Sequence, residues 1–514
     1  MDSLIFSSAQ MRDAEEAAFA RGVEVEALMD QAGAGIARAV RKFFPHSGRC
    51  IVYAGKGHNG GDALVAAERL ERAGWKIDIH LAFPEEDCSE LTRKKLQELR
   101  DAPDPVAAAL WATRGADVAS ASASRFAQRN GYTIVLDGLL GVGAKHLLRE
   151  PILAAARQIN QLRREQNAFV FAVDLPTGLD SDSGETDPDC VVADFTITIG
   201  FAKRGLIADA ALDFVGRLEV VPLPELTLRD SAPNELLAAV HSLSSLLPRR
   251  KFGAYKNQFG RIGVVAGSKG FVGAALMTAQ GALRAGAGLV DVFVPEEIYP
   301  IVAAAGPVEA MVKPVHSYRD LLEEKIDIWA VGPGLGKSRA SEVLQLIERA
   351  EQPMVVDADG LNILAEKIDT LKHCRGPRLV TPHPGELKRL FDPGKTSRAV
   401  TARNFCEQFP VTLLFKGSRT IVAERDRPLS FNTTGNPGMA SGGMGDVLTG
   451  VCAGLLGRKL SLYDAARLGA WVCGRAAEMA IFISGASEES LLASDVLNHL
   501  GAAFNELRNS NLYL

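Results

Sequence analysis

Cysteines in this chain are few and dispersed. The seven cysteines among 514 residues are odd in number and include no Cys-x-x-Cys pair. A disulfide framework or a zinc cluster requires cysteines at regular, short spacings. We therefore expect reduced, mostly buried thiols and a cytoplasmic protein.

Long hydrophobic runs and an excess of positive charge are also missing. No apolar run approaches the roughly 20 residues that a membrane-spanning helix needs. The first six residues, MDSLIF, contain neither the basic start nor the long apolar region of a secretory signal. The net charge of −5 offers no basic surface for nucleic acid. These absences predict a protein that binds neither membranes nor nucleic acid.

The composition that is present is that of a globular protein long enough for two domains. Apolar residues make up 47% of the chain and charged residues 23%, both ordinary proportions for a folded domain. Around residues 222–234, three prolines interrupt the otherwise periodic pattern. We expect a first domain over residues 1–225, a linker over 226–249 and a second domain over 250–514.

Short β-branched runs alternate with longer runs of helical period in both halves. The strands expected in the first half cover residues 50–54, 76–83, 133–137, 168–174, 194–199 and 217–221. The strands expected in the second half cover residues 261–266, 289–294, 326–331, 354–357, 378–381, 411–416 and 419–423. Such alternation is typical of parallel sheets with helices on both faces, so the sequence predicts the α/β class for both domains.

The segment Gly442–Asp446 (GGMGD) joins a glycine-dense loop to an apolar segment of helical composition. Glycine lets backbone N–H groups approach a ligand closely, and a helix start offers unpaired donors and a partial positive charge. Together these features predict an anion site for nucleotide phosphates. Asp446 would repel phosphate there unless it acts as a base on a hydroxyl that attacks a phosphoryl group. The alternative interpretation is a helix cap.

Three polar loops in the first half each follow an expected strand. They are residues 55–62 (GKGHNGGD), 137–143 (DGLLGVG) and 174–180 (DLPTGLD). Because the carboxyl ends of parallel strands meet at one edge of a sheet, Asn59, Asp137 and Thr177 could converge and offer oxygen ligands to a hard cation. Asp174 could act as an acid or a base. The alternative is that these acids only cap helices and brace turns.

The same three motifs resemble the epimerase domain that acts on hydrated nicotinamide nucleotides, NAD(P)HX. The resemblance covers about residues 9–222. It implies a Rossmann-like three-layer α/β sandwich in which Asn59, Asp137 and Thr177 bind a potassium ion and Asp174 is catalytic. The residues that it implies for substrate contact are His58, Asn59, Gly60, Gly61, Asp62, Gly141, Val142, Gly143, Ala144, Lys145, His146 and Leu147.

Three residues depart from the pattern of that family. His58 stands where the family has Asn, Ala63 where it has Gly, and Thr177 where it has Ser. Thr177 keeps the hydroxyl, so we expect the cation site to persist. His58 would alter substrate contacts or the pH response, since histidine titrates near neutrality. Ala63 would add a methyl group beside the phosphate or ribose of the substrate.

The second half carries a second ordered set of motifs. Residues 269–275, 332–336 (GPGLG), 381–386 (TPHPGE) and 416–420 (KGSRT) precede the GGMGD loop. Their order resembles the ADP- or ATP-dependent NAD(P)HX dehydratase domain, which has a ribokinase-like fold, over about residues 250–508. Residues 255–258 read YKNQ where that family has HKGD, a mild departure. The resemblance implies that Ala274, Gly334, His383 and Asp446 contact the hydrated nucleotide, and that Lys416, Gly417, Ser418, Arg419, Thr420 and Gly445 contact the adenine nucleotide.

The two resemblances together imply a bifunctional repair enzyme. Asp446 would deprotonate the C6 hydroxyl of the damaged ring for attack on the terminal phosphoryl of ADP or ATP, with a magnesium ion offsetting charge. Phosphate would then leave, restoring NAD(P)H, while the first domain interconverts the R and S epimers. The implied substrates are NADHX and NADPHX, with ADP favoured over ATP, and the family tends to form homo-oligomers. The alternative is a ribokinase-like small-molecule kinase with a non-catalytic N-terminal binding domain.

Overall fold

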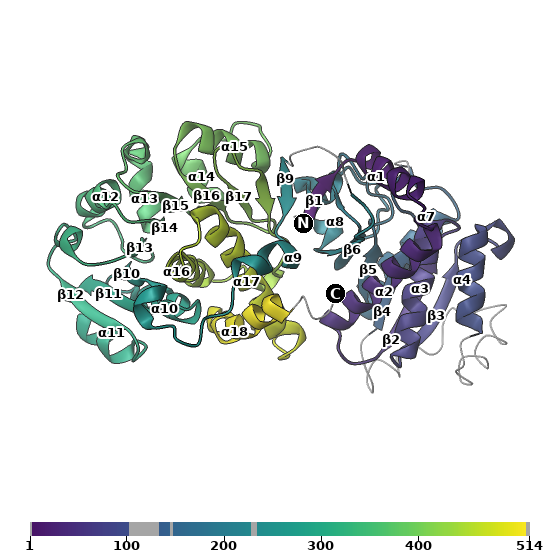
Figure 1. The fold of residues 1–514 in the computed structure, drawn as a ribbon, viewed down its shortest axis with the longest axis horizontal. Helices are drawn as coiled ribbons and strands as arrows, with labels where there is room; N and C mark the ends of the chain where they lie inside the picture. Colours follow the sequence, from purple (N-terminus) through teal and green to yellow (C-terminus); the bar gives the residue numbers. More distant parts are fainter. Residues whose placement is uncertain (1–2, 102–132, 144–146, 228–233, 510–514) are drawn as a thin grey trace. The chain divides into compact units, whose positions relative to one another are not determined.

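The computed structural model describes residues 3–101, 133–143, 147–227 and 234–509. The chain divides into two compact units, Leu4–Ala232 and Pro233–Leu514, the latter joined by residues 1–3 (Figure 1). Residues 107–124, whose Ala- and Ser-rich composition predicts a helix rather than a linker, lie outside the described residues, as do the expected substrate contacts Ala144, Lys145 and His146.

The N-terminal unit is built on a six-stranded parallel sheet. Its strand order is β3 (Lys76–Leu81), β2 (Arg49–Ala54), β4 (Thr133–Gly138), β5 (Phe169–Val173), β6 (Phe195–Ile199) and β8 (Arg217–Val221). A short parallel pair, β1 (Ser3–Phe6) with β7 (Ala202–Lys203), accompanies it. Helix α7 (Ile152–Gln166) shares a core with side chains of β2, β4 and β5. Because strand side chains alternate between faces, the opposite face is left for α2 (Val25–Phe43) and α3 (His58–Arg72).

The strand order of this sheet indicates where along its edge a ligand would bind. From β2 the chain moves outward to β3 and then returns to the other side of β2 as β4. At such a reversal the loops that leave the two neighbouring strands turn apart, and open α/β sheets bind ligands in the resulting crevice. Here the reversal lies between β2, which leads into α3, and β4, which ends at Asp137 and Gly138.

The C-terminal unit contains a longer, mostly parallel sheet. Its strands run in the order β12 (Met311–Val315), β11 (Leu289–Pro295), β10 (Arg261–Val265), β13 (Ile328–Val331), β14 (Met354–Val356), β15 (Arg378–Val380), β16 (Thr412–Phe415), β17 (Ile421–Ala423), β18 (Leu429–Phe431) and β9 (Glu235–Leu237). The β16–β17 and β17–β18 pairs are antiparallel and the others are parallel. The strand order reverses between β10 and β13, which predicts a second binding edge there.

One face of this sheet is covered by apolar helices that share a single core. They are α10 (Val272–Arg284), α16 (Met444–Leu456), α17 (Leu462–Phe482) and α18 (Ala493–Asn509) (Figure 1). The remaining helices of at least seven residues are α11 (Tyr299–Ala305), α12 (Ala340–Arg349), α13 (Asp359–Ala365), α14 (Pro384–Leu390) and α15 (Arg398–Gln408). In α17 the run from Ala465 to Ala480 is buried throughout, because this helix is enclosed by the sheet and by its neighbours.

The predicted α/β class is confirmed, and every strand expected from the sequence is present to within about two residues at each end. Five strands, β1, β7, β9, β12 and β18, were not predicted from the sequence. Residues 226–249 were also predicted to be a linker, whereas β9 pairs with β18 and α9 (Val240–Leu243) follows it. Strands of two to four residues leave no period to read, so only their partner strands define them, and the five-residue β12 (MVKPV) contains a proline.

All seven cysteines are unpaired, and six of them are buried. In the described ranges no helix combines the length and hydropathy needed to cross a membrane.

Candidate functional sites

The first candidate site lies at the strand reversal of the N-terminal sheet. Asn59 is in the first turn of α3, directly after β2, and its amide nitrogen donates to the carbonyl of Leu140 at 3.0 Å. The backbone N–H of Leu140 lies 3.3 Å from the hydroxyl oxygen of Thr177. Asn59, Asp137 and Thr177 therefore meet around one loop, as their positions after three strands suggested.

Asp137 is the charged member of this group and is fully buried. Its carboxylate accepts from the hydroxyl and the backbone N–H of Thr177, at 2.7 and 2.8 Å, and from the backbone N–H of Leu139 at 3.3 Å. Burial nevertheless raises the pKa of Asp137 to about 6, against the lowering effect of the Thr177 hydrogen bonds. None of its described partners is a cation, so this buried carboxylate suits a monovalent cation with oxygen ligands.

Asp174 lies at the end of β5 in an unusual backbone conformation. Its φ angle is +68°, a region that a residue with a Cβ adopts only when its surroundings require it. The carboxylate forms a buried ion pair with Lys203 and accepts from the hydroxyl of Thr198 at 3.2 Å and the N–H of Ile199 at 3.0 Å. These contacts give the Asp174 carboxylate one cationic partner and two neutral hydrogen-bond donors.

Two further acids share the electrostatic environment of Asp174. Burial, and then the charge of Asp174, raises the pKa of Asp62 well above its usual value. Burial also raises the pKa of Glu15 on α1 (Ser8–Ala20), with Lys203 opposing and Asp174 adding to the rise. The N-terminal unit thus places Asp174, paired with Lys203, near two acids whose pKa values are raised, an arrangement suited to acid–base work.

Glycines beside this site are constrained by packing as well as by ligand access. A Cβ on Gly60 would lie 2.1 Å from the carbonyl oxygen of Gly55, and one on Gly61 would lie 2.5 Å from the Met29 methyl carbon. A Cβ on Gly141 would only touch Asn59 at 3.4 Å. His58, Gly143 and Leu147 are exposed, and Gly141 and Val142 are half-buried, so these positions are open to a ligand.

One expectation about this site is wrong. Ala63 was expected to place a methyl group beside the phosphate or ribose. Ala63 is instead fully buried, and a Cβ on Gly138 would lie 2.4 Å from its methyl group. The Ala63 side chain therefore packs beneath the end of β4, because position 63 lies on the sheet-facing side of α3.

The second candidate site begins at the start of α16. Gly443 caps this helix with a φ angle of +87°, which glycine adopts without a steric penalty. Asp446 lies in the first turn and is half-buried. Burial, and then the charge of Asp357, raises its pKa to about 6, with Lys416 opposing. Asp446 can therefore take up or release a proton near neutral pH.

Asp357 and Lys416 form a buried pair beneath this helix start. The amine of Lys416 donates to one carboxylate oxygen of Asp357 at 2.7 Å, and the hydroxyl of Thr449 donates to the other at 2.8 Å. A Cβ on Gly445 would lie 3.3 Å from Asp357 and 3.4 Å from Lys416. Burial lowers the pKa of Lys416, but Asp357 and Glu386 outweigh it and hold the pKa above its usual value. Lys416 is thus a fixed positive charge next to Asp446.

His383 reaches the same region from the loop after β15. Its Nδ1 accepts from the N–H groups of Gly385 and Glu386 at 3.0 and 3.3 Å, which leaves the hydrogen of the neutral ring on Nε2. Glu386 lies 3.7 Å from Lys416 and 3.6 Å from the Nε2 of His383. His383, Glu386 and Lys416 therefore form a connected polar edge that ends in the Asp357 pair.

The strand reversal of this sheet brings the two expected glycine motifs together. Gly334, after β13, has a φ angle of +62°, and a Cβ there would lie 2.9 Å from the Cβ atoms of both Ala274 and Phe271. The hydroxyl of Ser268, after β10, donates to the Gly334 carbonyl at 2.7 Å. Gly334 and Ala274 are thus neighbours, as a shared ligand contact requires.

The segment Lys416–Thr420 forms the expected tight connection between β16 and β17. Gly417 has a φ angle of +153°, and a Cβ there would lie 2.5 Å from the Arg398 guanidinium. Gly417 and Ser418 are exposed, while Arg419 is buried. Only part of this connection therefore faces a ligand directly.

Comparison with known proteins follows the division into two units. Residues 262–498 match the family model described as NAD(P)H-hydrate dehydratase, and residues 25–205 match that of the YjeF-related protein N-terminus. The chain is 34% identical to the bifunctional NAD(P)H-hydrate repair enzyme Nnr of Moorella thermoacetica, covering 92% of this chain and 91% of that protein. The chain belongs to the family of bifunctional NAD(P)H-hydrate repair enzymes.

Other members of the repair-enzyme family agree in length. The Coxiella burnetii enzyme is 33% identical over 98% of this chain and 100% of its own. Among solved structures, the ADP/ATP-dependent NAD(P)H-hydrate dehydratase from Bacillus subtilis, co-crystallised with ATP and Mg²⁺, is 27% identical, covers 53% of this chain and 98% of its own, and has a TM-score of 0.46. The expected epimerase–dehydratase function is confirmed at the level of the repair-enzyme family, and a small-molecule kinase is not favoured.

The sequence analysis gave no role to several residues that complete these sites. Lys203 and Glu15 lie in segments that carried no catalytic motif, and Asp357 and Glu386 were seen only as parts of strand-end motifs. A charged residue directly after a buried strand was a usable indication for Asp357. The ion pair of Lys203 with Asp174 joins residues 29 apart in the chain, so no local spacing indicated that pair.

Proposed function

We propose that the C-terminal unit dehydrates the S epimer of NAD(P)HX by phosphoryl transfer from ADP or ATP, with Asp446 as the base. The observation that carries this proposal is the position of Asp446, half-buried in the first turn of α16 with a pKa of about 6 and next to the Lys416–Asp357 pair. A carboxylate with that pKa is ionised at neutral pH and can accept the hydroxyl proton.

The reaction would proceed in two steps. Asp446 accepts the proton of the C6 hydroxyl while that oxygen bonds to the terminal phosphorus and the bond to the leaving AMP or ADP breaks. The N1 lone pair then drives cleavage of the C6–O bond, phosphate leaves, and loss of a proton from C5 restores the dihydropyridine ring. The backbone N–H groups at the start of α16 and the amine of Lys416 would stabilise charge on the transferred group.

The binding roles of this unit are part of the same proposal. Ala274, Gly334 and His383 contact the hydrated nucleotide, and Nε2–H of His383 donates to it. The adenine nucleotide contacts Lys416, Gly417, Ser418, Arg419, Thr420 and Gly445, with ADP the preferred donor. The described residues include no cluster of three or more His, Cys, Asp or Glu able to hold a metal, so magnesium would be bound mainly through the phosphates, where it offsets their negative charge.

For the N-terminal unit we propose epimerisation at C6 with Asp174 as the acid–base residue. Asp174 forms an ion pair with buried Lys203, and its charge contributes to the raised pKa of Asp62. Asn59, Asp137 and Thr177 fit a potassium ion, because a buried carboxylate and two neutral oxygens face one loop. When bound, potassium would supply positive charge and orient the substrate phosphates beside residues 58–62 and 141–147.

The test is turnover by the full chain. Mixed NADHX epimers, with either ADP or ATP, are followed by NADH absorbance for the wild type and Asp446→Asn. We expect the variant to lose dehydration by at least about a hundredfold while binding ADP as before. Retained turnover in Asp446→Asn would remove the base role. We also expect a homo-oligomer, which light scattering on the purified chain measures.

A further inference from the structure

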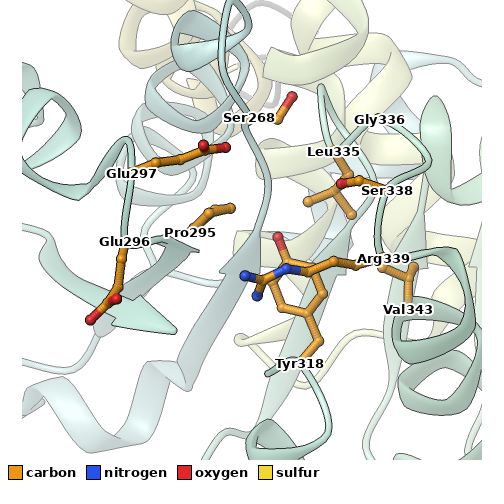
Figure 2. A pocket seen from close by; sticks show the side chains of 10 residues that line it. All are labelled: Ser268, Pro295, Glu296, Glu297, Tyr318, Leu335, Gly336, Ser338, Arg339 and Val343. Carbon is orange, nitrogen blue, oxygen red and sulfur yellow. The ribbon is translucent and has the colours of Figure 1, made fainter. Parts of the chain in front are cut away.

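A pocket of about 510 Å³ opens at the strand reversal of the C-terminal sheet (Figure 2). Its walls come from the loops after β10, β11, β12 and β13 and from the start of α12, and they include Ser268, Pro295, Glu297, Tyr318, Leu335 and Arg339. This volume suits a small-molecule ligand. The site described above uses none of these six side chains except Ser268, which orients Gly334.

The pocket adjoins the hydrated-nucleotide side of the active site. Ser268 lines it and hydrogen-bonds to the Gly334 carbonyl, and Gly336, two residues after Gly334, lines it as well. No residue of the Lys416–Thr420 connection, nor Gly445, contributes to the lining that the described residues form. The pocket is therefore continuous with the proposed hydrated-nucleotide contacts and separate from the adenine-nucleotide loop.

The pocket offers one available cation. The Arg339 guanidinium lies 5.4 Å from the ring centre of buried Tyr318 and makes one long hydrogen bond, 3.4 Å, to the Val315 carbonyl. Within the described part of the chain, no carboxylate lies within 4.0 Å of it. Arg339 also stands at the start of the ten-residue helix α12, where the backbone adds partial positive charge. A guanidinium without an acidic partner is a good ligand for phosphate.

The remaining walls suit the rest of a nucleotide. Tyr318, Leu335 and Val343 are buried and provide an apolar surface for a flat base. Figure 2 shows the carboxylate of Glu297 reaching in from the side opposite Arg339. Carboxylates are common acceptors for the hydroxyls of a ribose in α/β nucleotide sites.

We propose that this pocket binds the adenosine monophosphate half of the hydrated dinucleotide, with Arg339 contacting a phosphate and Glu297 the ribose hydroxyls. The inference rests on the proposed dehydratase function, and none of its four proposed contacts with the hydrated nucleotide, Ala274, Gly334, His383 and Asp446, lines this pocket. The adenosine half of the dinucleotide needs its own surface, and the pocket begins where those contacts stop.

The test compares two hydrated substrates and two variants in the full chain. The substrates are NADHX and hydrated reduced nicotinamide mononucleotide, which ends at the first phosphate and lacks the adenosine half. The variants are Arg339→Ala and, as a matched control, Arg349→Ala, an exposed arginine at the other end of α12. The Arg339 side chain makes no cap hydrogen bond to α12, so its loss leaves the helix start intact.

In Arg339→Ala we expect KM for NADHX to rise about tenfold, because the variant loses one charge-assisted hydrogen bond to the substrate. The values of kcat and of KM for ADP stay unchanged, as does kcat/KM for the mononucleotide. Arg349→Ala matches the wild type. If Arg339→Ala lowers kcat/KM equally for NADHX and for the mononucleotide, or raises KM for ADP, the proposal is overturned.

A binding measurement separates this proposal from the dehydratase function. Calorimetry with NADH in the presence of saturating ADP should show about tenfold weaker binding to Arg339→Ala than to the wild type. If the wild type fails to convert NADHX but NADH binding still depends on Arg339, the proposed function falls and the pocket assignment stands. If NADH binding is the same in both proteins, the pocket assignment falls whatever the turnover.

Discussion

At the residue scale, both candidate sites contain buried or half-buried carboxyl groups whose surroundings differ. Burial raises the pKa of Asp446 and of Asp137 to about 6. The Asp174 carboxylate instead forms an ion pair with buried Lys203 and accepts hydrogen bonds from Thr198 and Ile199. The same side-chain type can thus suit three proposed roles, with Asp446 as the base, Asp137 as a cation ligand and Asp174 as an acid–base residue, because the neighbours differ.

The pKa of Asp446 predicts the pH profile of dehydration. The base form is the ionised carboxylate, so kcat/KM for NADHX should be level above about pH 6 and fall about tenfold per pH unit below it. The measurement is initial rates of NADH formation between pH 5 and 8. ADP affinity measured over the same range is the control, since nucleotide phosphates also titrate there. A profile that stays flat down to pH 5 contradicts the base role.

Asp137 predicts a specific effect of potassium on stability. A ligand that binds only the folded state adds about 2.7 kcal/mol at a hundred times its Kd, so potassium should raise the Tm of the N-terminal unit. Asp137→Asn should abolish that rise. Asp189→Asn, an acid on the same unit that pairs with Arg157, should keep it. The measurement is thermal unfolding in potassium chloride against sodium chloride, and an equal response in all three proteins contradicts the site.

At the scale of elements, the order of the strands across each sheet decides which loops can meet. In each sheet this order reverses, between β2 and β4 in the N-terminal unit and between β10 and β13 in the C-terminal unit. The strands and main helices were predictable, because each is long enough to show its period. The strand orders were not, because they depend on which runs pair, and that is set by packing between segments far apart in the chain.

The start of α16 depends on glycine at position 443. Its φ angle is +87°, and a Cβ there would lie 2.4 Å from the Met277 sulfur. Gly443→Ala should therefore lower the free energy of unfolding by about 1–2 kcal/mol and reduce kcat by shifting Asp446. Gly442→Ala is the control, since a Cβ on Gly442 would meet nothing within 4 Å. Urea unfolding of both variants is the measurement, and equal stability losses contradict this reading of the turn.

At the scale of the whole molecule, two units of different topology each place a site at the carboxyl edge of their sheet. The chain is continuous through both, and its relatives carry the same pair over nearly their whole length. A stereospecific dehydratase alone leaves one epimer unrepaired. Joining it to an epimerase makes both epimers available to the second site.

This division predicts how the two activities combine. With mixed NADHX epimers and ADP, the wild type should convert all of the substrate in one fast phase. Asp174→Asn should give a fast phase whose amplitude equals the S fraction, followed by slow conversion at the spontaneous epimerisation rate. Stopped-flow absorbance of NADH measures both amplitudes. A variant that still converts both epimers rapidly contradicts the role of Asp174.

The sequence by itself determined the α/β class, the order of the motifs and the positions of the glycine-rich turns after the strands, because those properties depend on local period, glycine content and spacing. It also indicated Asn59, Asp137 and Thr177 as one group, since each follows a strand. Only the tertiary structure decided that Lys203 pairs with Asp174, that Asp357 binds Lys416, that Ala63 faces the sheet and that a pocket opens beside Gly334. Those outcomes depend on burial and on contacts between distant segments, which no local pattern encodes.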